Sequence, residues 1–191
     1  MSAINQKMYD RAYKFPFQIW TDRRISKEVK QLFGNSGNER KVLELGCGKG
    51  YNSIYIASQG FKVTGVDFSP TAVMKARGNA SDLINKPHFL VGDVTRLQLN
   101  NEHFDMALDI GCFHCLDAND QNLYAREVGR HIKRRGTLLM WTMNSPPPGA
   151  RALSNPDILE ETFAPDFNLK HFEISKRHWA PSRWYWLEKN E

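Results

Sequence analysis

The sequence predicts an α/β fold in which parallel strands alternate with helices. An apolar run of strand length, Lys41 to Leu45, leads into a loop of closely spaced glycines. A helix-length segment from Tyr51 to Gly60 follows, and a second strand-like run ends at Asp67. Strand, loop, helix and strand in this order, closing on a carboxylate, form the layout of a nucleotide-binding half-sheet.

The loop between the first strand and the helix carries Gly46, Gly48 and Gly50 at alternate positions. Residues without a Cβ allow a sharp turn and let a ligand approach the backbone closely. The following helix points its free amides at the loop, and Asp67 can accept both hydroxyls of a ribose. A dinucleotide fingerprint needs a third glycine at the sixth position, where this chain has Tyr51.

The run Glu44-Leu45-Gly46-Cys47-Gly48-Lys49-Gly50 resembles the first motif of the class I, Rossmann-like, S-adenosylmethionine-dependent methyltransferases. The resemblance implies a seven-stranded, mostly parallel sheet with an antiparallel last strand pair and helices on both faces. It also implies an enzyme that uses S-adenosylmethionine as its cofactor. Within the class, the chain looks most like the small-molecule group that acts on thiols, halides and thiopurines.

The resemblance assigns parts of the cofactor to the ends of successive strands. The glycine loop packs against the methionine end, and Asp67 holds the ribose. Asp93, after the expected third strand at 88–92, binds the adenine amino group, and Phe68 can lie on the adenine face. The backbone after the expected fourth strand, Phe104 to Ile110, contacts the methionine part. The cofactor residues predicted in this way are Trp20, Glu44, Gly46, Cys47, Gly48, Gly50, Asp67, Phe68, Asp93, Val94, Asp109, Ile110 and Gly111.

The first 38 residues are expected to form a helical extension that either packs on the sheet or closes over the cofactor as a lid. Five aromatic residues precede a helix expected from Asp22 to Phe33, with Asp22 as its cap and Gly34 as its end. The resemblance favours the lid, because the small-molecule group carries a Trp-containing amino-terminal segment. The aromatic residues are Tyr9, Tyr13, Phe15, Phe17 and Trp20.

His114 is the candidate catalytic residue, as a substrate contact or a proton acceptor, because it follows the fourth strand where the methyl group should lie. A histidine packed on the sheet edge is the alternative. Cys112 and Cys115 beside it, with Cys47, raise a metal or redox site as a further possibility. A second cysteine pair is missing from the sequence, so we expect no metal and treat the cysteines as small apolar fillers.

The remaining segments follow from helix and strand signals. Ser69 and Pro70 should begin a helix that ends at Gly78. A helix from Asp120 to Arg134, with Leu123, Val128 and Ile132 inward, should end at Gly136 and lead to a strand at 137–143. The later elements are a rigid loop that walls the acceptor site (144–149), a helix (154–163) and two strands (167–178 and 183–189).

Length and composition indicate one methyltransferase domain over residues 1–191, with an extension (1–38), a cofactor-binding core (39–145) and a carboxyl-terminal part (146–191). The sequence has no long apolar run and no signal-peptide pattern near its start, so we expect a cytoplasmic protein without a membrane contact. We expect a monomer or weak dimer.

The net charge of +5 is compatible with an anionic partner. We expect a small-molecule acceptor. RNA or protein methylation, with two basic clusters as the docking surface, is the alternative, and a non-catalytic cofactor-binding protein is the second alternative. The clusters are Arg23, Arg24, Lys27 and Lys30, and Arg130, Lys133, Arg134 and Arg135.

Overall fold

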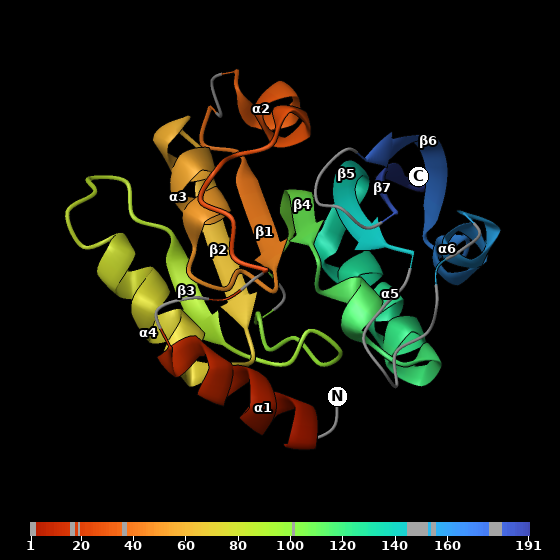
Figure 1. Ribbon diagram of the computed structural model, residues 1–191. Helices are drawn as coiled ribbons and strands as arrows, with labels where there is room; N and C mark the ends of the chain where they lie inside the picture. The colour runs from red at the N-terminus through yellow and green to blue at the C-terminus, as the bar shows by residue number, and fades with distance from the viewer. Residues whose placement is uncertain are drawn as a thin grey trace. The chain divides into compact units, whose positions relative to one another are not determined.

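The computed structural model describes residues 3–15, 18, 20–35, 38–100, 102–144, 153, 156–175 and 181–191 (Figure 1). It divides into two compact units, Met1–Val94 and Thr95–Glu191. The seven strands form a sheet with parallel pairs in both units and an antiparallel carboxyl-terminal end. The predicted fold class is therefore confirmed, whereas the single-domain boundaries stay a prediction.

The first unit holds three parallel strands in the order β3-β2-β1. The central strand β2 ends at Asp67, so this carboxylate lies at the sheet edge that the carboxyl ends of all three strands form. The strands are β1 (Lys41–Leu45), β2 (Lys62–Asp67) and β3 (His88–Val91), and the helices are α1 (Ala3–Lys14), α2 (Lys27–Phe33), α3 (Tyr51–Ser58) and α4 (Pro70–Asn79).

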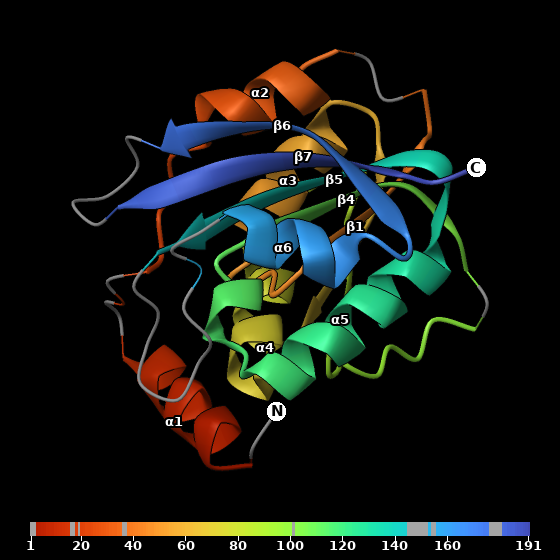
Figure 2. The same cartoon turned by 90° about the vertical axis from the view of Figure 1, so that its right-hand side faces the viewer.

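The second unit holds four strands in the order β4-β5-β7-β6, with β7 antiparallel to both of its neighbours. Figure 2 shows α5 and α6 on one face of these strands, where aromatic rings from both helices meet. The strands are β4 (Phe104–Ile110), β5 (Ile132–Met143), β6 (Phe167–Ser175) and β7 (Ser182–Lys189), and the helices are η1 (Phe113–Cys115), α5 (Ala118–His131) and α6 (Pro156–Phe163).

Two helix boundaries in the first unit differ from the prediction. The N-cap of α2 is Ser26, whose hydroxyl accepts a hydrogen bond from the amide of Val29, so the expected start at Asp22 was wrong. Asp22 instead accepts the amide of Arg24 within the preceding loop. The start of α4 is confirmed, with Ser69 as N-cap and Pro70 in the first turn, but the helix continues through Gly78 to Asn79.

The expected helix end at Gly136 was also wrong. α5 begins after the N-cap Asp117 and ends at His131, and Ile132 already belongs to β5, where it pairs with Phe104. Leu123, expected inward, is 38% exposed, and the neighbouring Tyr124 fills the core in its place. Strand pairing decides the end of this helix, because Ile132 satisfies the helical and the strand pattern equally well.

Parts of the predicted segments fall outside the described residues. These are positions 145–149 of the expected acceptor-site loop, positions 176–178 of the sixth strand, positions 154–155 of the expected helix before it, and Phe17 among the amino-terminal aromatics.

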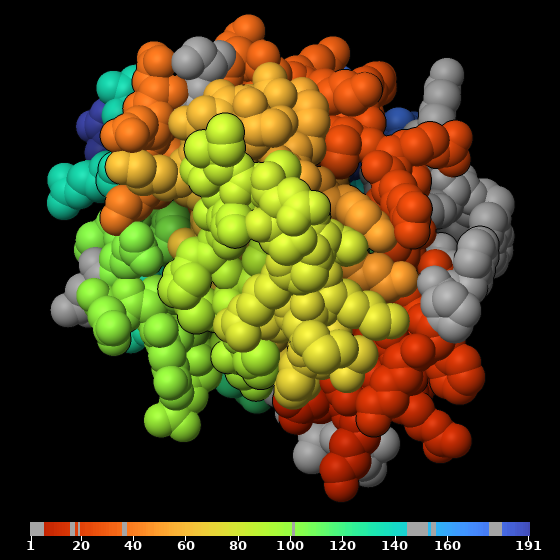
Figure 3. Space-filling model, turned by 90° about the vertical axis from the view of Figure 1, so that its left-hand side faces the viewer, coloured from red at the N-terminus to blue at the C-terminus, as the bar shows by residue number. Residues whose placement is uncertain are grey.

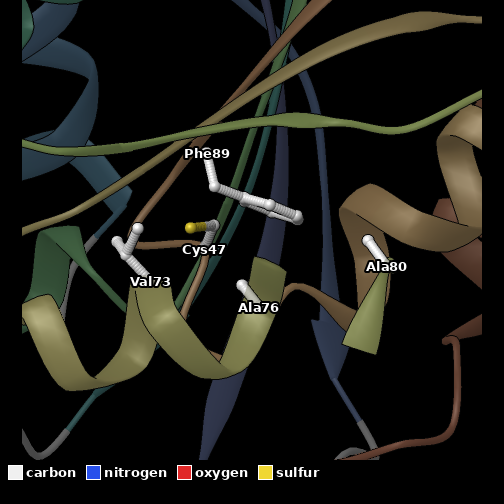
Figure 4. Close-up of a cluster of buried hydrophobic side chains, with 5 residues drawn as sticks. All are labelled: Cys47, Val73, Ala76, Ala80 and Phe89. Carbon is white, nitrogen blue, oxygen red and sulfur yellow. The ribbon is translucent and has the colours of Figure 1, made fainter. Parts of the chain in front are cut away.

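Phe89 of β3 lies at the centre of a buried cluster that holds the glycine loop against α4. Cys47, Val73, Ala76 and Ala80 pack around it (Figure 4). A Cβ at Gly50 would lie 2.6 Å from the phenyl ring, and one at Gly65 would lie 2.9 Å from the ring and 3.0 Å from the Cβ of Cys47. These two glycines therefore make room for Phe89, and Cys47 is an apolar filler, as expected.

The packing around Phe89 predicts opposite effects for two glycine substitutions. Gly65→Ala should lower the free energy of unfolding by about 1–3 kcal/mol, because neither Phe89 nor Cys47 can retreat within the cluster. Gly78→Ala should raise it by about 0.5–1 kcal/mol, since this helical position has nothing within 4 Å of the new methyl group. Urea unfolding of both variants measures the difference, and equal effects would contradict the packing account.

Candidate functional site

Asp67, the last residue of β2, is a buried carboxylate that joins two loops. Its Oδ2 accepts a hydrogen bond from the amide of Gly48 at 2.9 Å, and its Oδ1 accepts one from the amide of Ser69 at 2.9 Å. The side chain is 3% exposed, and this burial raises its pKa to about 6. Each carboxylate oxygen accepts more than one hydrogen bond, so both can still receive a ligand hydroxyl.

The glycine loop has the conformation that its sequence predicts. Gly46, Gly48 and Gly50 all have positive φ, at 69°, 52° and 77°, which side chains with a Cβ rarely adopt. The loop is anchored below, where the amides of Gly46 and Cys47 both donate to the carbonyl of Val66. The N-cap residue of α3 is Gly50, which has no side chain to bond the first-turn amides, and the amide of Ser53 donates to the carboxylate of Glu44 instead.

Glu44, predicted to contact the cofactor, is occupied by the helix that follows the loop. Its Oε1 accepts a hydrogen bond from Asn52 Nδ2 at 3.1 Å, and its Oε2 accepts one from the hydroxyl of Ser53. The side chain is 2% exposed, and burial raises its pKa to about 7. Glu44 thus supports the start of α3, and a direct cofactor contact stays a prediction.

Aromatic side chains from the amino-terminal segment meet the residues around Asp67. The Trp20 ring is 43% exposed, lies 5.4 Å from the Tyr9 ring, and donates from Nε1 to the Tyr13 hydroxyl at 3.3 Å. Tyr9 in turn lies 5.7 Å from the ring of Phe68. The Tyr13 hydroxyl lies 3.0 Å from the place that a Cβ on Gly48 would take. Trp20 and Phe68 are therefore brought together through Tyr9.

Sequence analysis placed Tyr13 among the aromatic residues of the possible lid and did not assign Asp10 to the site. The spacing of Tyr9 and Tyr13, four residues apart, places both on one face of a helix. α1 carries them along α4, and Figure 3 shows the two helices side by side in red and yellow.

In the second unit, the carboxylate of Asp109 organises the turn after β4. It accepts hydrogen bonds from the amides of Cys112 and Phe113 at 2.8 and 3.0 Å and from the Tyr124 hydroxyl at 2.7 Å. Burial raises its pKa to about 6. The side chain is thus committed to the protein, and the predicted cofactor contact at this position involves the backbone of residues 109–111, where Gly111 has a φ of 92°.

His114 is buried in the second unit and neutral at physiological pH. Its Nδ1 faces the amide of Met143, which donates at 3.4 Å, so the ring proton belongs on Nε2. The ring lies edge-on to Trp141 at 5.7 Å, and burial lowers its pKa to about 4. A group with this pKa is a poor proton acceptor near neutral pH. The burial of the ring against Trp141 agrees with the alternative of a histidine packed on the sheet edge, and a substrate contact stays a prediction.

The other predicted positions lie where their strands end. Val94 is buried, and Asp93 precedes it after β3. Cys115 donates from Sγ to the carbonyl of Gly111 at 3.3 Å, within its own turn. Among the described residues, no group of three His, Cys, Asp or Glu side chains could hold a metal ion. None of the described helices is long and apolar enough to cross a membrane.

Comparison with known proteins places the glycine loop and Asp67 inside a recognised domain. Residues 42–136 match the family model described as a methyltransferase domain. The match supports the class I S-adenosylmethionine-dependent methyltransferases, which the Glu44–Gly50 motif predicted, and S-adenosylmethionine is the cofactor of this class.

Individual methyltransferases resemble the chain over part of its length. An uncharacterized methyltransferase of Schizosaccharomyces pombe is 40% identical over 91 residues, which are 48% of this chain and 62% of the relative. The 2-heptyl-1-hydroxyquinolin-4(1H)-one methyltransferase of Mycobacteroides abscessus is 25% identical over 138 residues, 68% of this chain and 61% of the relative. The chain thus spans about three fifths of the length of both curated relatives.

A solved structure shows the same fold over nearly the whole chain. It is the Burkholderia thailandensis 1,6-didemethyltoxoflavin-N1-methyltransferase, with its substrate and S-adenosylhomocysteine bound. The TM-score is 0.80 at 21% sequence identity, covering 99% of this chain and 88% of that structure.

The buried carboxyl of Glu44 predicts a pH-dependent stability. Because its pKa is raised from 4.5 to about 7, its contribution to stability is fully present below about pH 4.5 and is lost as the pH rises through 7. A shift of this size corresponds to about 3 kcal/mol. Glu44→Gln should remove this dependence, since a glutamine oxygen can accept from Asn52 while the Ser53 hydroxyl reverses to accept from the glutamine amide.

Urea unfolding of both proteins between pH 5 and 8.5 measures the effect. The wild-type protein should lose stability toward high pH more steeply than the variant. Parallel curves would show that Glu44 titrates at an ordinary pKa.

Proposed function

We propose that this chain is an S-adenosylmethionine-dependent methyltransferase that acts on a small-molecule acceptor, with thiols and other soft nucleophiles as the first candidates. The hydrogen bond between Asp67 and Gly48 carries this proposal, because it joins the strand-end acid to the glycine loop as a ribose-binding site requires. The named acceptor of the Mycobacteroides abscessus relative, a hydroxyquinolone, supports a small organic substrate.

The proposed cofactor contacts in the first unit follow its strand ends. Asp67 accepts the ribose hydroxyls, Phe68 covers the adenine, Asp93 and the amide of Val94 meet its edge, and the glycine loop holds the methionine part. The bound cofactor supplies an electrophilic methyl group on a positively charged sulfur.

The contribution of the chain to such a reaction is to position the acceptor and to exclude water. Holding two reactants in line can lower the barrier by up to about 7–11 kcal/mol. Aromatic rings beside a cation add about 0.5–2 kcal/mol each. The Tyr13 hydroxyl lies near Gly48, and Trp20 donates a hydrogen bond to that hydroxyl. We assign to these two rings the lid function.

His114 is proposed to orient the acceptor through its Nε2–H group. Since Nδ1 faces the amide of Met143, Nε2 is the nitrogen left to donate to an acceptor atom. This role needs no change of protonation, which agrees with a pKa near 4.

The two basic clusters are partly neutralised by acidic neighbours. Among the described residues, each of five ion pairs has a partner in one of the clusters, and these pairs take charge away from a docking surface for RNA. They are Arg24–Asp22, Lys27–Glu28, Arg130–Glu127, Lys133–Asp105 and Arg135–Glu191. A small-molecule acceptor is therefore the better supported substrate, and a non-catalytic binding protein would bind the cofactor without methylating any acceptor.

Calorimetric titration with S-adenosylhomocysteine tests the cofactor site. The wild-type protein should bind it and should not bind a nicotinamide dinucleotide. Asp67→Ala should weaken binding by about 1–3 kcal/mol, which is about 5- to 150-fold, because the ribose hydroxyls lose their acceptor. The exposed Asp82→Ala is the matched control and should bind as the wild type does. Unchanged affinity in Asp67→Ala would refute the ribose role.

Trp20 tests the lid. Trp20→Ala should lower the free energy of unfolding by less than about 1 kcal/mol, since the ring is partly exposed and makes one long hydrogen bond. It should lower kcat about tenfold or more with a thiol acceptor, because an aromatic ring beside the cation is lost. Trp20→Phe keeps the ring and should retain most of the activity. Matching losses of activity and stability in Trp20→Ala would contradict the lid.

A further inference from the structure

Asp10 of α1 binds the first turn of α4, far away in the sequence. Its Oδ1 accepts a hydrogen bond from the Ser69 hydroxyl at 2.7 Å and another from the amide of Thr71 at 2.9 Å. Both bonds lower the pKa of Asp10, so its carboxylate is charged at neutral pH. A negative charge at a helix amino terminus is also favoured by the helix dipole.

Ser69 connects this contact to the ribose-binding carboxylate. The residue is fully buried, and its own amide donates to Asp67 Oδ1 at 2.9 Å. Its hydroxyl oxygen accepts from the amide of Ala72, while the hydroxyl proton goes to Asp10. Asp67 Oδ2 then receives the amide of Gly48. Hydrogen bonds thus run without a break from α1 through Ser69 and Asp67 to the glycine loop.

Two further hydrogen bonds hold α1 in the same place. Gln6 Nε2 donates to the carbonyl of Phe68 at 2.8 Å, and Lys75 of α4 donates to the carbonyl of Tyr13. These contacts fix both ends of the α1 face that carries Asp10. With α1 in this position, the Tyr13 hydroxyl lies over Gly48.

We propose that Asp10 is a positioning residue for cofactor binding. By accepting the Ser69 hydroxyl it leaves lone pairs of the Asp67 carboxylate available to the ribose. It also holds α1 in the position in which Tyr13 covers the glycine loop. The proposal rests on the proposed function of Asp67. It adds a residue that does not itself contact the cofactor.

The physical reason lies in the Ser69 hydroxyl. A buried hydroxyl that loses its acceptor must find another one. Ser69 is already bonded to the carboxylate of Asp67 through its amide. Without Asp10, the Ser69 hydroxyl would donate to Asp67 as well, and this hydrogen bond would occupy a lone pair that the ribose needs. Removal of Asp10 should therefore affect ligand affinity beyond its effect on folding.

The coupling acts in both directions, since linkage is reciprocal. A ligand that stabilises the docked position of α1 must in turn bind more tightly, by the same factor, when α1 is docked. Bound cofactor should accordingly slow the amide hydrogen exchange of α1, and loss of the Asp10 contact should remove this protection.

Three variants separate positioning from plain structural support. Asp10→Ala removes the acceptor, whereas Asp10→Asn keeps an oxygen that can accept from both Ser69 and Thr71. Lys7→Ala changes an exposed residue of the same helix and is the matched control. Each protein is titrated with S-adenosylhomocysteine at a temperature at which all are folded, and hydrogen exchange of residues 6–13 is measured with and without the ligand.

We expect Asp10→Ala to raise the Kd about tenfold and to lose the ligand-dependent protection of α1, while Asp10→Asn stays within about threefold of the wild type. Lys7→Ala should match the wild type in both. Unchanged affinity in Asp10→Ala, or equal weakening in Asp10→Ala and Asp10→Asn, would overturn the proposal.

Failure of the proposed cofactor site would be visible separately. In that case the wild-type protein would not bind S-adenosylhomocysteine at all. Faster exchange of α1 in ligand-free Asp10→Ala than in ligand-free Asp10→Asn would then still support the tether, and equal exchange would overturn it.

Discussion

The hydrogen bonds of the Asp67 carboxylate are the constraint on which the first unit depends. One oxygen holds the amide of Gly48 and the other holds the amide of Ser69, so a single side chain fixes the glycine loop and the start of α4 together. Burying a carboxylate is costly unless its oxygens are hydrogen-bonded, and here two backbone amides offset much of that cost. The remaining cost is visible as a pKa of Asp67 that burial raises to about 6.

A comparison of the two strand-end carboxylates shows why they serve different purposes. Asp67 and Asp109 both end a strand and both accept amides of the turn that follows. Asp109 also receives the hydroxyl of Tyr124 from α5, which ties the turn to a helix of its own unit. The same local arrangement, a strand-end carboxylate that accepts the amides of the following turn, therefore supports the fold in both units, and only Asp67 is proposed to bind a ligand as well.

The sequence predicted several elements that depend on neighbours along the chain and missed contacts that distant partners decide. β1, β2, β4 and the Ser69–Pro70 helix start follow from apolar runs, glycines and a capping residue, and all lie where they were expected. The end of α5 was wrong because Ile132 fits either periodicity, and pairing with Phe104 settles it. The contact of Asp10 with Ser69 joins residues 59 positions apart, so no local pattern could reveal it. The motif identified Glu44, but not that Ser53 and Asn52 occupy its oxygens.

The residues proposed for the cofactor and the residue proposed for the acceptor belong to different units, and this division bears on substrate specificity. The carboxylate proposed for the ribose, the glycine loop and the aromatic residues of the lid all belong to residues 1–94 and are tied to one another by the hydrogen bonds of Asp67 and Ser69. His114, proposed to meet the acceptor, belongs to the second unit, where it depends on Met143 and Trp141 instead. Among the described residues, the contacts given for His114 lie within the second unit and those given for Asp67 lie within the first. The acceptor role proposed for His114 and the ribose role proposed for Asp67 therefore rest on separate sets of hydrogen bonds.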